Sequence, residues 1–224
     1  MSYFNLAIDG PAGAGKSTIA KKIAKQLGFI YVDTGAMYRA MALYFLRNKI
    51  DATDSGAIEK ACQKVDVTIE YRNGEQLVIL NGENVNGLIR TEEVGNMASA
   101  SSVNKAVRMK LVELQQSLAK KADVVMDGRD IGTYVLPDAD LKIYLTASTQ
   151  ERARRRWLEL KEKGITANLE EIEKDITSRD HRDMTREFAP LRQAEDAVYL
   201  DSSDLSIDEV VAKIVSLYEG VNKK

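Results

Sequence analysis

The stretch IDGPAGAGKST, residues 8–18, contains a match to the pattern G-x-x-x-x-G-K-[ST] at residues 10–17. Small residues in this pattern let backbone N–H groups point at phosphate oxygens. The lysine, Lys16, reaches the β- and γ-phosphates, and the hydroxyl of Ser17 ligates Mg²⁺. The stretch therefore predicts a nucleoside triphosphate site. Its expected ligand-binding residues are Gly10, Pro11, Ala12, Gly13, Ala14, Gly15, Lys16, Ser17 and Thr18.

The segments on both sides of this loop support the same interpretation. An apolar run at residues 4–8 predicts a strand before it, and an amphipathic pattern predicts a helix over about 17–27. The positive end of that helix would face the anion. Further apolar runs alternate with helical periodicity, which predicts parallel βαβ units with helices on both faces. The other expected strands are 29–32, 124–126, 142–145 and 197–200, and the other helical segments are 36–48, 91–121, 148–163, 169–185 and 206–219.

Residues 65–87 break this pattern, because apolar and polar residues alternate there. The pairs Asn73-Gly74 and Asn81-Gly82 are typical of tight hairpin turns. We expect a small antiparallel lobe inserted between helical segments. Two interpretations stay open, a purely structural hairpin and a lobe that closes over a substrate.

The composition narrows the class of protein. A chain of 224 residues with 44% hydrophobic residues suits one globular domain. Its 32 Lys and Arg against 34 Asp and Glu lack the basic excess of a nucleic-acid-binding protein. The single cysteine, Cys62, excludes a disulfide framework within the chain. No apolar run approaches the roughly 18 residues of a membrane span, and no signal peptide is evident, so we expect a soluble cytoplasmic protein.

A second polar group lies in VVMDGRDIG, residues 124–132. Asp127 ends an apolar strand, and in a parallel sheet that end faces the same crevice as the glycine-rich loop. Asp127 is therefore a candidate for the metal shell, directly or through water, or for fixing a substrate. The alternative is an ordinary turn aspartate, but the adjacent Arg129 and Asp130 favour a functional role.

The arginines predict a second phosphate group. Arg152 and Arg156 lie four residues apart, hence on one helical face. Taken singly, each arginine is typical of a solvated surface, but arginine forks bind phosphate bidentately, and phosphoryl transfer requires the moving charge to be neutralised. The clustered residues are Arg152, Arg154, Arg155 and Arg156, then Arg179, Arg182 and Arg186, with Arg39 and Arg108 elsewhere.

The scarcity of histidine bears on the group that accepts a phosphoryl. His181 is the single histidine, which gives little support to a histidine general base. A phosphate acceptor needs no base, because its second pKa is roughly 6 and it is largely ionised near neutral pH. The composition favours a phosphate acceptor, although Asp127 or Asp130 could serve as the base for a hydroxyl acceptor.

Four stretches, IDGPAGAGKST, DTGAMYR, DGRDIGT and RDHRDMTR, resemble in sequence and order the bacterial cytidylate kinase family of P-loop nucleoside monophosphate kinases. The resemblance covers essentially the whole chain. It implies an α/β P-loop kinase with a five-stranded parallel sheet flanked by helices, forming one domain over residues 1–224. Within that domain it implies an inserted antiparallel β lobe that binds the monophosphate (63–90) and a short helical lid (about 148–168).

The resemblance also implies a reaction, the transfer of the γ-phosphoryl group of ATP–Mg²⁺ to CMP or dCMP. Arg152 and Arg156 would then be lid arginines, with Arg155 a weaker third, and Arg129 would join Lys16 as catalytic. The residues that match those around CMP are Thr34, Arg39, Ser99, Arg108, Arg129, Asp130, Arg179, Asp183 and Arg186. Among these, Ser99, Arg179 and Asp183 match the family residues that recognise the ribose. The family is mostly monomeric, which implies a monomer.

Three alternatives remain: a kinase for another monophosphate such as UMP, a kinase for a small hydroxyl metabolite, and a nucleotide-gated switch. A GTP switch is expected to carry an N-K-x-D motif, which the sequence lacks. A switch also leaves Arg129 and Arg186 without a role.

Overall fold

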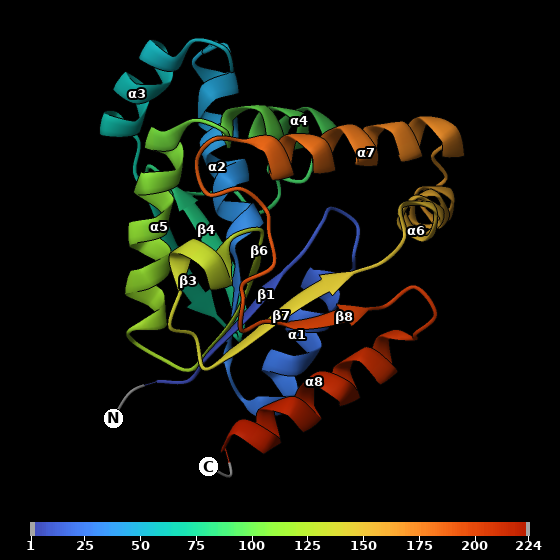
Figure 1. Cartoon of the computed structure of the whole chain (residues 1–224). Coiled ribbons are helices and arrows are strands. Elements are labelled where there is room, and N and C mark those ends of the chain that lie inside the picture. Colours follow the sequence, from blue (N-terminus) through green and yellow to red (C-terminus); the bar gives the residue numbers. More distant parts are fainter. Residues whose placement is uncertain (1–2, 223–224) are drawn as a thin grey trace.

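Five parallel strands form the central sheet, in the spatial order β2-β6-β1-β7-β8 (Figure 1). This computed structural model describes residues 3–222. The strands are β1 (Asn5–Asp9), β2 (Ile30–Asp33), β6 (Val124–Gly128), β7 (Leu141–Thr146) and β8 (Val198–Asp201). Because all five run in the same direction, their carboxyl ends meet at one edge, where a doubly wound sheet binds its ligands.

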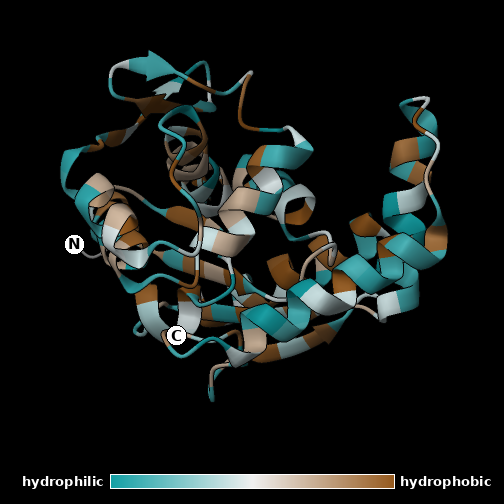
Figure 2. Ribbon diagram, turned by 90° about the horizontal axis from the view of Figure 1, so that it is seen from above, coloured by the Kyte–Doolittle hydropathy of each residue, from teal (hydrophilic) through white to brown (hydrophobic). Residues whose placement is uncertain are grey.

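Helices cover both faces of the sheet. α1 (Lys16–Leu27) and α8 (Ile207–Asn222) pack on one face, and α2 (Thr34–Arg47) and α5 (Lys105–Ala119) on the other. Figure 2 shows the hydrophobic residues gathered in the strands between these helices. The remaining helices are α3 (Ser55–Lys64), α4 (Glu92–Ser101), α6 (Thr149–Glu162), α7 (Leu169–Thr185) and the π-helix η1 (Ile131–Val135).

Strand β1 shows why both faces are covered. Leu6 and Ile8 point into the apolar cluster that includes residues of α1 and α8, whereas Ala7 between them belongs to the cluster of α2 and α5. Successive side chains of a strand point to opposite faces, so a continuous apolar run needs a helical layer on each side. Among residues 3–222, no helix combines the length and the apolar character needed to cross a membrane.

The alternating segment forms a three-stranded antiparallel sheet, the β lobe, of β3 (Val67–Arg72), β4 (Glu75–Leu80) and β5 (Glu83–Asn84). Both residues of the Asn73-Gly74 turn have positive φ, at 53° and 78°, as hairpin turns of this type require. The Gln76 side chain bonds both backbone groups of Asp33, at 2.9 and 3.2 Å. The buried Leu80 belongs to the same core cluster as α2 and α5, so the β lobe shares the core of the main sheet.

The structure differs from the sequence-based expectation in three elements. The helical segment expected over residues 91–121 is two helices, α4 and α5, because Asn104 caps a new helix by accepting a hydrogen bond from the Ala106 N–H (2.8 Å). Helix α3 was not expected from the apolar pattern, and Asp54 caps it. The π-helix η1 was not expected either, because contacts from outside the segment hold it.

Candidate active site

The loop between β1 and α1, residues 10–18 and here called the phosphate loop, depends on glycine. Gly10, Gly13 and Gly15 have φ of 152°, 76° and 85°. A Cβ on Gly10 would lie 1.9 Å from the carbonyl oxygen of Leu145 on β7. No side chain in the described part of the chain caps α1, so the first N–H groups of this helix can meet an anion.

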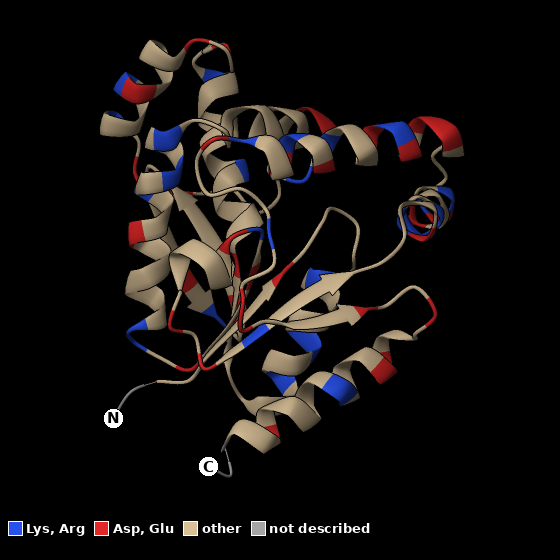
Figure 3. Cartoon of the chain, viewed as in Figure 1, with Lys and Arg blue, Asp and Glu red and all other residues tan. Residues whose placement is uncertain are grey.

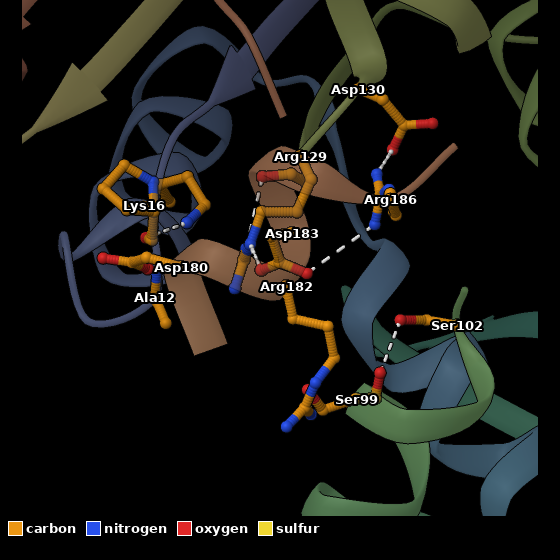
Figure 4. Close-up of polar contacts among 12 residues, drawn as sticks. Ala12, Lys16, Ser99, Ser102, Arg129, Asp130, Asp180, Arg182, Asp183 and Arg186 are labelled. Atoms are coloured by element: carbon orange, nitrogen blue, oxygen red, sulfur yellow. Dashed lines mark hydrogen bonds and ion pairs between the residues drawn. The ribbon is translucent and has the colours of Figure 1, made fainter. Parts of the chain in front are cut away.

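Lys16 lies buried at the base of the phosphate loop. Its ammonium donates a hydrogen bond to the Pro11 carbonyl (2.7 Å), so that the side chain folds back on its own loop (Figure 4). Burial lowers the pKa of Lys16, and the nearby charge of Arg129 lowers it further. A bound phosphate would offset both effects.

Ser17 and Asp127 meet beside the phosphate loop, as the sequence predicts. The Ser17 hydroxyl donates to one carboxylate oxygen of Asp127 (2.8 Å), and the Tyr31 hydroxyl donates to the other (2.8 Å). Burial raises the pKa of Asp127, and the neighbouring Asp33 raises it further. Mg²⁺ is usually held by one or two protein oxygens together with waters and phosphate oxygens, and this pair fits that requirement.

A second group, here called the arginine–aspartate cluster, consists of Arg108, Arg129, Asp130, Asp183 and Arg186. Arg129 Nε donates to Asp183 (2.8 Å), and the other carboxylate oxygen of Asp183 lies 3.7 Å from Arg186. Arg186 lies 3.4 Å from Asp130, which also accepts a hydrogen bond from Arg108. Figure 4 shows most of this chain of ion pairs. The sequence predicted all five residues, and the structure brings them together from α5, the end of β6 and the end of α7.

Two predicted hydroxyl residues lie around this crevice. The Thr34 hydroxyl donates to the backbone carbonyl of Asp127 (2.6 Å) at the start of α2. Ser99 on α4 accepts a hydrogen bond from Arg182 of α7 (2.8 Å). Thr34 therefore lies beside the Ser17–Asp127 pair, and Ser99 lies beside the helix that supplies Asp183.

Arg39 and Arg179 are cations without a close carboxylate partner among the described residues. Arg179 Nε is buried with no hydrogen-bond partner within residues 3–222, and burial, with Arg129 next in effect, lowers its pKa to about 10. Arg39 makes one long hydrogen bond, to the Ile89 carbonyl (3.4 Å), and burial followed by the charge of Arg90 lowers its pKa. This crevice thus carries more positive charge than its own aspartates neutralise.

The predicted lid arginines differ in position. Arg152 is 4% exposed and donates to the Ala12 carbonyl of the phosphate loop (2.9 Å). The side chain of Arg156 is 47% exposed and pairs with Glu159 one turn further along α6 (2.8 Å). Arg155 donates to the Ser202 carbonyl after β8 (2.6 Å). The structure brings only Arg152 of these three to the phosphate loop.

Several polar residues of the site escaped the sequence analysis. Asp9, directly before the phosphate loop, accepts hydrogen bonds from the N–H groups of Ile131 (2.8 Å) and Gly132 (2.7 Å) at the start of η1. Asp180 on α7 contacts the phosphate loop itself. Figure 3 shows the acidic and basic residues interspersed along α7. The signal for Asp180 was its place between the arginines of SRDHRD, and that for Asp9 was its position beside Gly10.

The strand order, the glycine-rich loop between β1 and α1, and the arginine-rich crevice together define a P-loop kinase fold. Shikimate kinase from Bacteroides thetaiotaomicron shares it, with a TM-score of 0.51 at 15% identity over 96% of this chain and 98% of that chain. An uncharacterized protein from Eubacterium ventriosum gives a TM-score of 0.55 at 12% identity over 98% and 99% of the two chains. At such identities the likeness shows the fold alone.

The sequence comparisons identify the family. A family model described as cytidylate kinase matches residues 6–220. A protein named cytidylate kinase from Caldicellulosiruptor bescii is 53% identical over 223 residues, covering 100% of this chain and 99% of that protein. Another of the same name from Caldicellulosiruptor saccharolyticus is 54% identical over 97% of this chain and 96% of that protein. The chain belongs to the cytidylate kinase family.

Proposed function

We propose that this protein transfers the γ-phosphoryl group of ATP–Mg²⁺ to the phosphate of CMP or dCMP, giving CDP or dCDP. The observation that carries the proposal is the presence of two cationic groups in one crevice, the phosphate loop around Lys16 and the arginine–aspartate cluster with Arg39 and Arg179 beside it. Two phosphate groups are needed to offset them. The family membership agrees with a nucleotide pair as substrates.

In this proposal the phosphate loop binds the triphosphate of ATP. The backbone N–H groups of residues 10–18 and the ammonium of Lys16 surround the phosphates. Ser17 and Asp127 would hold Mg²⁺, directly or through water. When bound, the ion neutralises charge on the phosphate oxygens. Lys16 supplies a fixed positive charge on the same side without any rearrangement of solvent.

The acceptor nucleotide occupies the second part of the crevice. In this proposal Arg39, Arg108 and Arg129 bind the CMP phosphate and base, with Thr34 near the base, and Asp130 and Arg186 contact cytosine, as the resemblance to the family implies. The buried ion pairs of Arg108 and Arg186 with Asp130 hold these three side chains in place, which lowers the entropic cost of binding.

Chemistry in this arrangement needs positioning and charge stabilisation more than proton transfer. An ionised oxygen of the CMP phosphate attacks the γ-phosphorus, and the bond from that phosphorus to the bridging oxygen of ADP breaks. No base is required, because the acceptor is already ionised near neutral pH. We propose that Arg129 and Arg152, and Arg156 after closure of residues 148–168, stabilise the transferring group, and that closure with the β lobe excludes water.

Initial rates of ADP release with CMP, dCMP, UMP and AMP as acceptors test the proposal. We expect CMP and dCMP to be the best of the four. Absence of turnover with CMP contradicts the proposed function, and a faster rate with UMP reassigns the acceptor. Nucleotide binding without phosphoryl transfer to any acceptor supports a switch.

Asp183 tests the ribose assignment. If Asp183, together with Ser99 and Arg179, reads the 2′-hydroxyl, Asp183→Ala reduces kcat/KM for CMP and dCMP by different factors. The ratio of kcat/KM for CMP to that for dCMP is measured on one enzyme preparation. A general loss of activity from breaking the ion pairs to Arg129 and Arg186 affects both values equally and leaves this ratio unchanged. Equal losses on both acceptors rule out the ribose role of Asp183.

The monomeric state, the cytoplasmic location and the lack of a nucleic-acid partner stay predictions of the sequence. Size-exclusion chromatography with light scattering, at the concentrations used for the kinetic assays, tests the first of them.

A further inference from the structure

Asp180 lies on the helix of the acceptor crevice, but its side chain reaches the donor site. It is 8% exposed and sits on α7, one turn before Asp183. One carboxylate oxygen accepts the Ala12 N–H of the phosphate loop (3.2 Å), and the other pairs with Arg152 (2.6 Å). Figure 4 shows Asp180 beside Ala12. Asp180 is therefore a direct link between the two halves of the site.

Arg152 also binds Ala12 of the phosphate loop. One of its nitrogens, Nη1, bonds both Asp180 and the Ala12 carbonyl (2.9 Å). Its Nε donates to the Ala147 carbonyl (2.9 Å), and its Nη2 donates to the Thr149 hydroxyl (3.0 Å). Both the N–H and the C=O of Ala12 are thus held by side chains that also pair with each other.

The backbone packing at this point is equally close. A Cβ on Gly13 would lie 3.3 Å from Cβ of Arg152, so α6 rests directly on the loop. A shift of α7 therefore cannot leave the loop unchanged. It must either carry Ala12 along or break a buried ion pair, and an unpaired buried charge is strongly unfavourable.

We propose that Asp180 is a positioning residue that couples the acceptor site to the donor site, so that bound CMP raises the affinity for ATP. The coupling rests on the proposed function. CMP orders the face of α7 that carries Arg179 and Asp183, and Asp180 on the same helix transmits that order to Ala12. By linkage, ATP raises the affinity for CMP by the same factor.

The test compares Asp180→Asn with Asp175→Asn. Asp175 lies on the same helix and is exposed, so its variant changes the net charge equally at a surface position. The affinity for a non-hydrolysable ATP analogue with Mg²⁺ is measured by calorimetry, with and without CMP, and kcat and both KM values are measured with ATP. In the wild type and in Asp175→Asn we expect CMP to raise the analogue affinity by about fivefold or more.

For Asp180→Asn we expect the coupling factor, the ratio of the analogue affinities with and without CMP, to fall to about 1. We expect kcat to fall about 10- to 100-fold, because the phosphate loop would be displaced by a fraction of an ångström. Affinity for CMP alone should stay near the wild-type value, because Asp180 faces the phosphate loop. A merely structural role would lower stability without changing the coupling factor. Wild-type coupling in Asp180→Asn overturns the inference.

If Asp180→Asn does not fold, Asp180→Glu replaces it. This variant keeps the charge but moves the carboxylate by one methylene, so it should also reduce the coupling factor, and wild-type coupling in it overturns the inference. The two proposals can be contradicted separately. If the wild type does not turn over CMP, the proposed function is wrong. If the wild type turns over CMP and Asp180→Asn keeps wild-type coupling, only the role of Asp180 is wrong.

Discussion

At the scale of single residues, the site is characterised by buried cations that lack a matching anion. Among residues 3–222, Lys16 bonds only a carbonyl oxygen, and Arg179 has a buried Nε without a hydrogen-bond partner. Both have pKa values lowered by burial. Such groups destabilise the folded chain by themselves, and a bound anion would offset this cost.

In the proposed reaction, Lys16→Ala removes a positive charge that stabilises the transferring phosphoryl group. We expect kcat to fall about 10²- to 10³-fold, as when one preorganised charge-stabilising donor is lost. Stability should be unchanged or slightly higher, because a buried ammonium is removed. Kinetics and urea unfolding on the same sample check this, and a variant with nearly normal kcat contradicts the role of Lys16.

Asp9 predicts a pH dependence of stability. Burial raises the pKa of its carboxyl to about 7, against roughly 3.9 in an unfolded chain. The folded protein therefore binds this proton more tightly, and the stabilisation is complete below about pH 4 and lost as the pH rises towards 7. Asp9→Asn cannot titrate.

We accordingly expect the free energy of unfolding of the wild type, minus that of Asp9→Asn, to fall between about pH 4 and pH 7. Urea titrations of both proteins without nucleotide, at several pH values in this range, measure the difference. The other titrating groups are common to the two proteins and cancel. A difference that is independent of pH contradicts the raised pKa.

At the scale of elements, the phosphate loop is defined by its contact with a neighbouring strand. Gly10 has φ of 152°, and its α-carbon faces the Leu145 carbonyl of β7 so closely that no side chain fits. Only glycine allows β1 to end there and the chain to turn back into α1. The close approach of β1 and β7 therefore fixes where the loop begins.

Gly10→Ala should destabilise the protein by more than the roughly 1–3 kcal/mol of backbone strain, because β7 must also move. Gly28→Ala is the matched control, since Gly28 also has positive φ (72°) but open space around it. For the control we expect a loss of stability of about 1–2 kcal/mol. Thermal unfolding with and without ATP–Mg²⁺ measures the stability of both variants. Equal losses of stability in the two variants contradict the steric explanation.

At the scale of the whole molecule, the β lobe and the sheet unfold together if they share one core. Val78 and Leu80 of β4 are buried in the cluster formed by α2, α5 and the sheet. The contact of Gln76 with Asp33 joins the lobe to the edge strand β2. Closure of the lobe over a substrate would thus be a movement of part of a continuous core.

Leu80→Ala should lower the global free energy of unfolding by about 2–5 kcal/mol, as for other buried leucines. Ile165→Ala, at a side chain that is 51% exposed, serves as the control and should change it by less than about 0.5 kcal/mol. Circular dichroism and hydrogen exchange should report one transition. Early exchange confined to residues 67–84, at unchanged global stability, contradicts a shared core.

The sequence by itself determined the phosphate loop, the alternation of strands and helices and the family. These features are local: glycine spacing, apolar periodicity and short motifs can be seen without knowing which segments meet. It also named Arg129, Asp130, Asp183 and Arg186 of the arginine–aspartate cluster, which lie within the motifs, whereas Arg108 came from the family resemblance. Short α3 and the break between α4 and α5 escaped it, since caps such as Asp54 and Asn104 decide them rather than periodicity.

Only the tertiary structure decided which charges pair. The bonds from Asp9 to η1 and from Asp180 to Ala12 join segments 122 and 168 residues apart in the sequence. Likewise, Arg152 points into the phosphate loop while Arg156 on the same helix is exposed. Side-chain partners of this kind depend on strand order and helix packing, which no local pattern specifies, and the buried charges then take the partners that the crevice offers.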